Sequence, residues 1–178
     1  MSPLTGERGE RGFTLIEMIV VITLITILVA LGVPSYRYVT TTSRVAGEVN
    51  ALLGDLQFAR AEAIKEGQPV SACPSSNGAA CLSSSDWNSG WIVFSDVNGN
   101  GNMDAGQDTV LRVQKPFTSG DTFSANNGPR SSLTFNREGF AIGLSGAVTI
   151  TLDDVTGTPT YTRCLEISVI GALTSSTC

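Results

Sequence analysis

The stretch FTLIEMIVVITLITILVALGVP, residues 13–34, decides the architecture of this 178-residue chain. Of the 21 residues from 13 to 33, sixteen are apolar and only Glu17 is charged, and a helix of that length rises about 30 Å, the thickness of a bilayer's hydrocarbon core. A secretory signal has a shorter apolar core, followed by a small-residue cleavage site. Here the polar-to-apolar boundary falls in front of the run, at Gly12, where a different protease would act. The sequence predicts one membrane-length segment attached to one domain.

Glu17 is the anomaly in this segment, because an unpaired carboxylate inside a membrane is costly. If the chain is cut after Gly12, Phe13 becomes the new N-terminus and its α-amine lies one helical turn from Glu17. An amine on one subunit could then neutralise Glu17 on its neighbour and favour lateral assembly of the helices. The alternative is a tolerated interfacial glutamate near the helix end.

After Pro34 the pattern becomes amphipathic through residues 35–66. An apolar stripe at helical spacing indicates a face that packs against the rest of the chain, and it consists of Val45, Val49, Leu52, Leu53, Leu56, Ala59 and Ala63. The charged residues lie largely off that stripe: Arg44, Glu48, Asp55, Glu62 and Lys65. Gly67 and Pro69 end the pattern. We predict one helix from Phe13 to Glu66, bent at Pro34, where the ring removes a backbone donor.

Residues 67–178 are predicted to form an antiparallel β head, because short apolar runs alternate with Gly and Asn turns and no second helical pattern appears. The fold class is therefore α+β, a long bent helix packed on an antiparallel sheet. The expected strands are Val70–Cys73, Trp91–Ser95, Val110–Gln114, Ser132–Asn136, Phe140–Leu144, Ala147–Leu152, Tyr161–Ile170 and Ala172–Thr177. Trp91 is expected in the core, and Trp87 either there or at an interface.

Four cysteines, all after the membrane segment, suggest an exported head in which disulfides persist. Cys73 and Cys81 flank a turn-rich stretch, and Cys164 and Cys178 lie symmetrically about Gly171, as cross-strand partners in a hairpin would. The spacing favours the pairs 73–81 and 164–178 among three possible connectivities. Free or metal-binding thiols are the alternative, although no CxxC spacing supports zinc.

Composition excludes several classes of function. The chain has no histidine, which removes Ser-His-Asp and Cys-His catalysis and any imidazole base. The net charge is −5, and residues 67–178 hold nine acidic and five basic residues, which disfavours DNA as a main partner. The scattered arginines of the head, Arg112, Arg130, Arg137 and Arg163, are interpreted as solvated residues or local ion pairs.

The stretch RGFTLIEMIVVITLITILVALGVPSY resembles the class III signal of type IV pilins and type II secretion pseudopilins. The resemblance implies cleavage by a prepilin peptidase between Gly12 and Phe13, N-methylation of Phe13, an assembly role for Glu17 and a helix kink at Pro34. Residues 1–12 would be the leader, and residues 13–34 the transmembrane and assembly half of the helix. The acids Glu7 and Glu10 make this leader less basic than is usual for the family.

Residues 86–113, DWNSGWIVFSDVNGNGNMDAGQDTVLRV, resemble the signature of the GspH/FimT/FimU group of pilins, and the Cys73/Cys81 loop is typical of its FimU-like members. Some relatives used for DNA uptake carry a C-terminal G-R-x-R element. The corresponding stretch here, Gly171-Ala172-Leu173-Thr174, has neither arginine.

Residues 96–108 also have a chemical interpretation as a calcium loop, because alternating carboxylate and amide oxygens suit a hard cation. Its candidate ligands are Asp96, Asn98, Asn100, Asn102, Asp104 and Asp108. The bidentate glutamate of an EF-hand is missing, since Gln107 occupies its position. A self-bonded turn is the alternative, because Asn and Asp are good turn residues. No other cofactor is expected.

Together these features predict a minor pilin of a type IV pilus priming or tip complex, with prepilin peptidase, other minor pilins and the major pilin as partners. It would start in a bacterial inner membrane with its head in the periplasm and end in a pilus. The alternatives are a type II secretion pseudopilin, a DNA-binding minor pilin for natural transformation, and a membrane-tethered enzyme. The last is disfavoured because no nucleophile or acid/base constellation is present.

Overall fold

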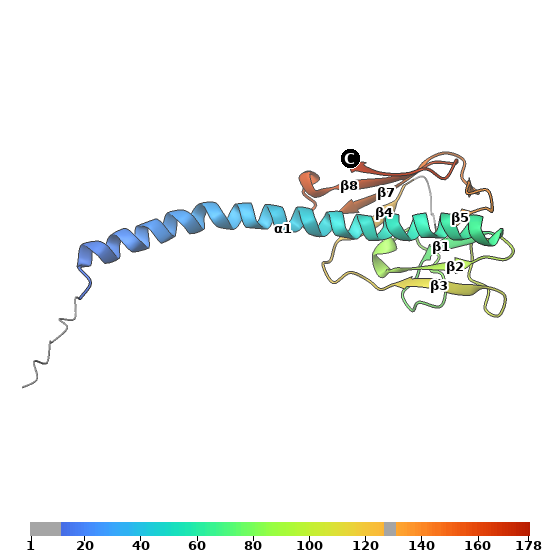
Figure 1. The fold of residues 1–178 in the computed structure, drawn as a ribbon, viewed down its shortest axis with the longest axis horizontal. Helices are drawn as coiled ribbons and strands as arrows, with labels where there is room; N and C mark the ends of the chain where they lie inside the picture. Colours follow the sequence, from blue (N-terminus) through green and yellow to red (C-terminus); the bar gives the residue numbers. More distant parts are fainter. Residues whose placement is uncertain (1–11, 127–130) are drawn as a thin grey trace, which may run out of the picture. The chain divides into compact units, whose positions relative to one another are not determined.

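The computed structural model describes residues 12–126 and 131–178 (Figure 1). The predicted leader lies outside the described residues except for Gly12, and so does Arg130. Helix α1 spans Leu15–Glu66 and continues through Pro34, which does not end it. The bend expected at Pro34 stays a prediction. The chain divides into two compact units, Met1–Thr40 and Thr41–Cys178, so α1 contributes to both.

The second unit contains two antiparallel sheets. The five-stranded sheet has the order β3-β2-β1-β5-β6. Its strands are β1 (Val70–Pro74), β2 (Trp91–Ser95), β3 (Thr109–Gln114), β5 (Leu133–Phe135) and β6 (Ala141–Ile142). The four-stranded sheet has the order β4-β7-β8-β9, with β4 (Thr122–Ala125), β7 (Val148–Asp153), β8 (Arg163–Ile167) and β9 (Leu173–Thr177). The predicted α+β class is confirmed.

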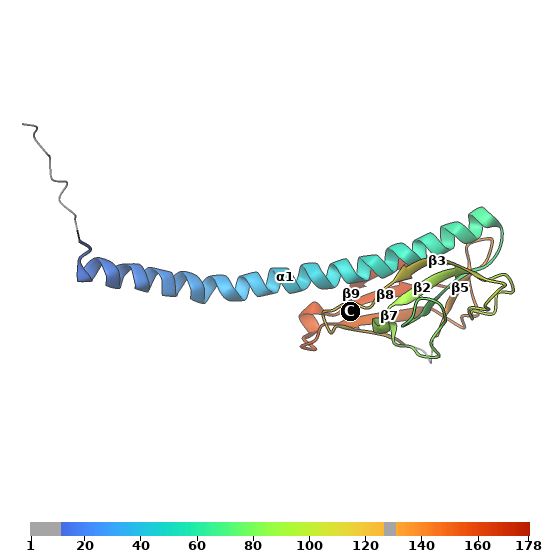
Figure 2. The same cartoon turned by 90° about the horizontal axis from the view of Figure 1, so that it is seen from below.

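The second half of α1 lies along both sheets (Figure 2). Its buried residues are Val45, Glu48, Val49, Leu52, Leu56, Ala59 and Ala63, which is the predicted stripe with two differences. Leu53 is only partly buried, and Glu48, predicted to lie off the stripe, is 5% exposed. The stripe packs against β1 and β5 of one sheet and β7 and β8 of the other, so a single helix face completes the core of both sheets.

Strand β2 is buried on both faces, which explains its almost unbroken apolar sequence. Trp91 and Val93 face the core beneath α1, whereas Ile92 and Phe94 join Cys73 in a second, smaller cluster. Met103, Val110 and Cys81 cover that cluster. In β7 burial alternates residue by residue, as expected for a strand with one covered face.

The structure corrects three strand predictions. Strand β4 was not expected, and its one fully buried residue is Phe123. The predicted strand Tyr161–Ile170 shortens to β8, because Pro159–Tyr161 form a 3-10 turn and Gly171 N donates to Ser168 O in a tight turn. The predicted strand Phe140–Leu144 shortens to the two residues of β6.

Candidate assembly segment

The candidate processing and assembly residues lie together at the start of α1. Gly12, Phe13 and Thr14 precede the helix, and Phe13 is 76% exposed. The backbone N–H of Glu17 donates to Thr14 Oγ1 at 3.3 Å, so Thr14 caps the helix. Glu17 lies in the first turn, where a carboxylate suits the helix dipole. The T-x-x-E spacing of Thr14 and Glu17 is the capping-box signal by which the sequence marks this helix start.

The remainder of this segment presents only apolar surface and satisfied hydroxyls. It is long and apolar enough to cross a membrane, and none of its most hydrophobic window is buried. The hydroxyls of Thr23 and Thr26 donate to the carbonyl oxygens of Ile19 and Ile22, each at 2.7 Å. Because those hydroxyls are bonded within the helix, Glu17 is the polar group that still requires an external partner in a membrane or a helical bundle.

Two disulfides join Cys73 to Cys81 and Cys164 to Cys178, the pairing that the spacing favoured. The first closes a loop in which Asn77 Oδ1 accepts the N–H groups of Ala79 and Ala80. The second joins Cys164, the second residue of β8, to Cys178, the residue after β9. The described residues contain no free cysteine, so thiol chemistry and thiolate metal binding have no ligand there.

The Asp96–Asp108 loop is closed by its own hydrogen bonds. Asp96 is 0% exposed and accepts Ser71 Oγ at 2.7 Å, Gly101 N at 2.7 Å and Asn100 N at 3.1 Å. Asp108 accepts the N–H groups of Val97 and Asp104. These bonds close the loop around its own carboxylates.

The loop's amides point the wrong way for a cation. Asn98 and Asn100 direct their Nδ2 donors to Asp104 Oδ2, at 2.9 and 2.8 Å, whereas a calcium ion would bind their oxygens. Asn102 donates its backbone N–H to Asn100 Oδ1 at 2.7 Å. In the described residues no three His, Cys, Asp or Glu side chains are grouped to hold a metal. The geometry favours the self-bonded turn over calcium binding, and a calcium titration can decide between these two predictions.

Asp55 ties α1 to the five-stranded sheet. Its Oδ2 accepts Trp91 Nε1 at 2.9 Å, and its Oδ1 accepts Arg112 Nη1, also at 2.9 Å. The Arg112 guanidinium lies 3.7 Å from the centre of the Phe58 ring, a cation–π contact. The tryptophan and the arginine of the signature stretch therefore meet on one helix carboxylate.

A second connection involves Glu48, which sequence reasoning had placed at the surface. Arg44 pairs with Asp121, and Ser119 Oγ donates to Glu48 Oε1 at 2.8 Å. Burial raises the pKa of Glu48, the charge of the nearby Asp121 carboxylate acts in the same direction, and the Ser119 hydroxyl opposes them. Glu48 Oε2 is buried with no partner among the described residues. The fold therefore favours a proton on this carboxyl.

Trp91 lies in the core, as predicted, and Trp87 is 0% exposed. The alternative interface role for Trp87 is therefore wrong. The 3-10 turn Trp87–Ser89 holds it between the sheets, and Asp86 forms a bridge to Ser124 of β4.

Comparison with known proteins relates this chain to two family models. The family model of the type II transport protein GspH matches residues 48–171, and the prokaryotic N-terminal methylation motif matches residues 8–33. No curated protein matches the chain significantly.

Two crystal structures of a minor pilin have the same fold. A crystal structure of the type IV minor pilin FimU of Pseudomonas aeruginosa is 24% identical, covers 75% of this chain and 91% of its own, and gives a TM-score of 0.55. A second crystal form of FimU is 20% identical, covers 79% of this chain and 92% of its own, and gives a TM-score of 0.58. The minor pseudopilin EpsH of the Vibrio cholerae type 2 secretion system is 13% identical, covers 75% of this chain and 96% of its own, and gives a TM-score of 0.48. At these identities the likeness to FimU shows the fold.

The pilin resemblance of the sequence is confirmed, because the methylation motif covers the segment around Glu17 and the GspH model covers well over half of the chain. The protein belongs to the GspH family of minor pilins and pseudopilins.

Proposed function

We propose that the protein is a minor type IV pilin, a structural subunit of a pilus priming or tip complex. Prepilin peptidase would cut between Gly12 and Phe13, and the subunit would move from the inner membrane into the fibre, with its head first in the periplasm and then at the cell surface. The observation that carries the proposal is Glu17, the one charge in the apolar stretch of residues 13–33, four residues after Phe13.

The assembly step follows from electrostatics. Inside a bilayer or a helical bundle, a lone carboxylate costs several kcal/mol, and a neighbour's α-amine removes that cost by pairing with it. The pairing is available only after cleavage, because an uncut chain has an amide at Phe13 instead of an amine. Processing therefore enables assembly, and the head surfaces select which pilin subunits are neighbours.

The test replaces Glu17 with alanine in the full chain, with Glu66→Ala as the matched control at the other end of the same helix. We expect Glu17→Ala to insert into membranes normally and to be cleaved, but to be at least tenfold depleted in sheared pili. Glu66→Ala should be incorporated like the wild type. Equal recovery of both variants in pili would refute the pairing mechanism.

A second candidate is a pseudopilin of a type II secretion system, which the description of the matched family favours. The same helix and the same Glu17 pairing would serve either machine. Deletion of the gene separates the two, because loss of pili with intact secretion supports the pilus and the reverse supports secretion.

DNA binding is the third and weakest candidate. The acidic balance of residues 67–178 and the two missing arginines at Gly171–Thr174 oppose it. A gel shift with the full chain in detergent at low salt should show little or no retardation of duplex DNA. The lack of histidine and the structural role of the family are the reasons for proposing no enzymatic activity.

A further inference from the structure

The four-stranded sheet ends at β9, and this edge has none of the usual protection. Strand β9 reads LTSST, with no charge and no proline. Natural sheets protect exposed edges with charges, prolines, very short strands or covering segments, because an open edge pairs with other chains. An unprotected edge of five residues therefore calls for an explanation.

The other sheet edges of the described residues are protected. Strand β6 has two residues, and the N–H of Ala141 donates to Val169 O. Strand β4 is covered by residues 85 and 86, through Ala125 N bonded to Ser85 O and the bridge from Asp86 to Ser124. Strand β3 carries Arg112. The open edge at β9 is therefore an exception within its own protein.

The register of the β8–β9 hairpin identifies which backbone groups are open. Ser168 N donates to Ala172 O at 3.0 Å, and pairs in an antiparallel ladder alternate between bonded and non-bonded. Leu173, Ser175 and Thr177 fall in the non-bonded pairs, opposite Ile167, Leu165 and Arg163. Their N–H and C=O groups point away from β8. Within residues 12–126 and 131–178, no hydrogen bond beyond the ladder uses these groups.

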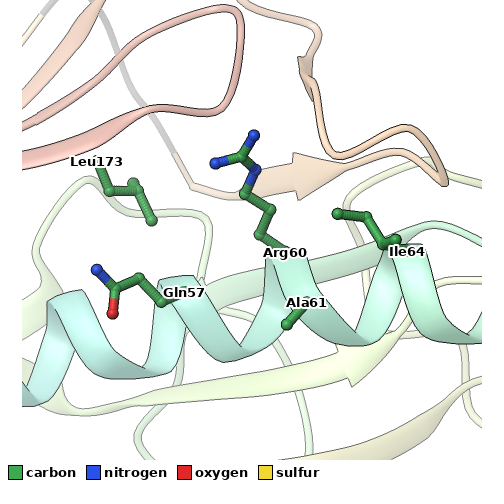
Figure 3. A pocket seen from close by; sticks show the side chains of 5 residues that line it. All are labelled: Gln57, Arg60, Ala61, Ile64 and Leu173. Atoms are coloured by element: carbon green, nitrogen blue, oxygen red, sulfur yellow. The ribbon is translucent and has the colours of Figure 1, made fainter.

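Two hollows, of about 400 and 330 Å³, lie between β9 and one face of α1, and together we call them the groove. The first is lined by Gln57, Arg60, Ala61, Ile64 and Leu173 (Figure 3). The second is lined by Ala46, Val49, Asn50, Arg163, Ser175, Ser176 and Thr177. Ile64 lines the first hollow and is 53% exposed, so it offers an apolar surface to a bound partner.

The charge of the groove is opposite to that of the protein. No acidic residue lines either hollow, and each contains one arginine. Among the described residues, Arg44, Lys65, Arg112 and Arg137 pair with carboxylates, whereas Arg60 and Arg163 bond only to carbonyl oxygens. A guanidinium has five N–H donors, so both arginines keep donors for an anionic partner.

We propose that the groove between α1 and β9 binds an extended acidic segment of a partner protein, which joins the sheet as one more strand beside β9. The outward groups of Leu173, Ser175 and Thr177 would bond to its backbone, and its carboxylates would pair with Arg60 and Arg163. Strand addition at an open edge takes its affinity from main-chain bonds and its specificity from side-chain contacts.

The spacing of the arginines sets the spacing of the acids. Leu173 lines the hollow of Arg60, and Thr177 lines that of Arg163. Four residues of strand separate them, which is about 13 Å. Acidic side chains four residues apart lie on one face of a strand and match this span. A peptide backbone fits the alternating donors and acceptors of β9, which a phosphate backbone does not. The site goes beyond the proposed assembly role and lies wholly within residues 41–178.

The test uses the full chain in detergent micelles and a fluorescent peptide, acetyl-Thr-Glu-Val-Thr-Val-Glu-Thr-amide. Fluorescence anisotropy should show saturable binding, and NMR shifts should be largest at the amides of Leu173, Ser175 and Thr177. A peptide with both glutamates replaced by lysine should bind at least tenfold more weakly. So should a peptide with N-methylated valines, which cannot donate to a strand edge.

Variants of the protein locate the site. Arg163→Gln should weaken peptide binding about tenfold, whereas Lys115→Gln, the same change of charge outside the groove, should not. The modified peptides keep the test independent of any folding defect in a variant. Absence of binding by the acidic peptide, equal binding of the lysine peptide, or displacement of the acidic peptide by a dT oligonucleotide would each overturn the proposal. The assembly proposal is judged separately, by Glu17→Ala in pili.

Discussion

Trp91 donates its indole N–H to Asp55 Oδ2 at 2.9 Å, a bond that joins the buried strand β2 to helix α1 beside its apolar stripe. The indole is 1% exposed, so water cannot replace this acceptor. The same carboxylate holds Arg112 of β3. One helix residue thus fixes the position of two strands.

Asp55→Ala should lower the free energy of unfolding by about 2 kcal/mol, because it leaves a buried N–H without an acceptor. Asp55→Asn keeps an amide oxygen for Trp91 and should cost about half as much. Near-ultraviolet circular dichroism of the full chain in detergent, followed through thermal unfolding, reports on Trp91 directly. Arg112→Gln is the control that keeps the indole bond. Equal losses for the alanine and asparagine variants would show that the indole bond contributes nothing.

Glu48→Gln should stabilise the head at neutral pH and have little effect near pH 4. The fold raises the pKa of Glu48, so the stabilising contribution of its proton is complete below the unfolded value and is lost as pH rises through the folded value. Glutamine imitates the protonated form at every pH. Melting temperatures measured across this range should diverge as pH rises, by about 3 °C for 1 kcal/mol.

The control for this prediction is Glu62→Gln on the same helix. Lys65 lowers the pKa of Glu62, so neutralising that carboxyl removes a favourable charge and should slightly lower the melting temperature at neutral pH. A rise for both variants would indicate a general effect of negative charge instead of the burial of Glu48.

Gly171→Ala should destabilise the head by about 3 kcal/mol, from a left-handed backbone and a steric collision. Gly171 has a φ of 75°, and a Cβ there would collide with the carbonyl oxygen of Gly139. Gly157 has a φ of 63°, and no heavy atom lies within 4 Å of its would-be Cβ. Gly157→Ala should therefore cost only the backbone part, about 1 kcal/mol.

Chemical denaturation of the two glycine variants separates the cost of the left-handed backbone from the cost of the collision with Gly139. If they lose the same stability, the turn at Gly171 does not depend on its contact with Gly139. That contact joins the turn after β5 to the turn before β9, and Arg60 Nε donates to the same Gly139 oxygen at 2.9 Å.

Calcium should neither bind to nor stabilise the Asp96–Asp108 loop. Titration calorimetry of the full chain should show no calcium heat, and the melting temperature should be the same in millimolar calcium and in EDTA. Asp96→Ala should cost about 3 kcal/mol, because three donors lose a buried charged acceptor. A melting temperature that rises with calcium in the wild type and not in Asp96→Ala would show instead that the loop binds calcium.

The elements of this fold could largely be predicted from sequence, because their signals are local. Periodicity marked the helix, Gly67 and Pro69 marked its end, and turn residues separated most strands. Strand β4 was missed because TFSA is short and has a single large apolar residue. The division of the strands into two sheets was not predictable in this way, since it depends on pairings between distant residues such as Val70 and Phe135.

The candidate site shows the same division. Gly12, Phe13 and Glu17 form a local motif, so the sequence alone could propose them, whereas it could not give the partners of the charged helix residues. Asp121 lies 77 positions from Arg44, and Trp91 lies 36 positions from Asp55. Glu48 was misplaced because a single glutamate at a helical position carries no local sign that a serine and two charged groups will cover it.

The single helix face shared by both sheets has a consequence for how the head forms. Neither sheet can hide its inner face without residues 45–63, so a fragment that starts at Gly67 would expose the core of both and aggregate. The shortest fragment that keeps the folding unit starts near Thr41. Because α1 precedes every strand in the chain, the surface on which each sheet condenses is synthesised first, and the strands need not wait for a later segment.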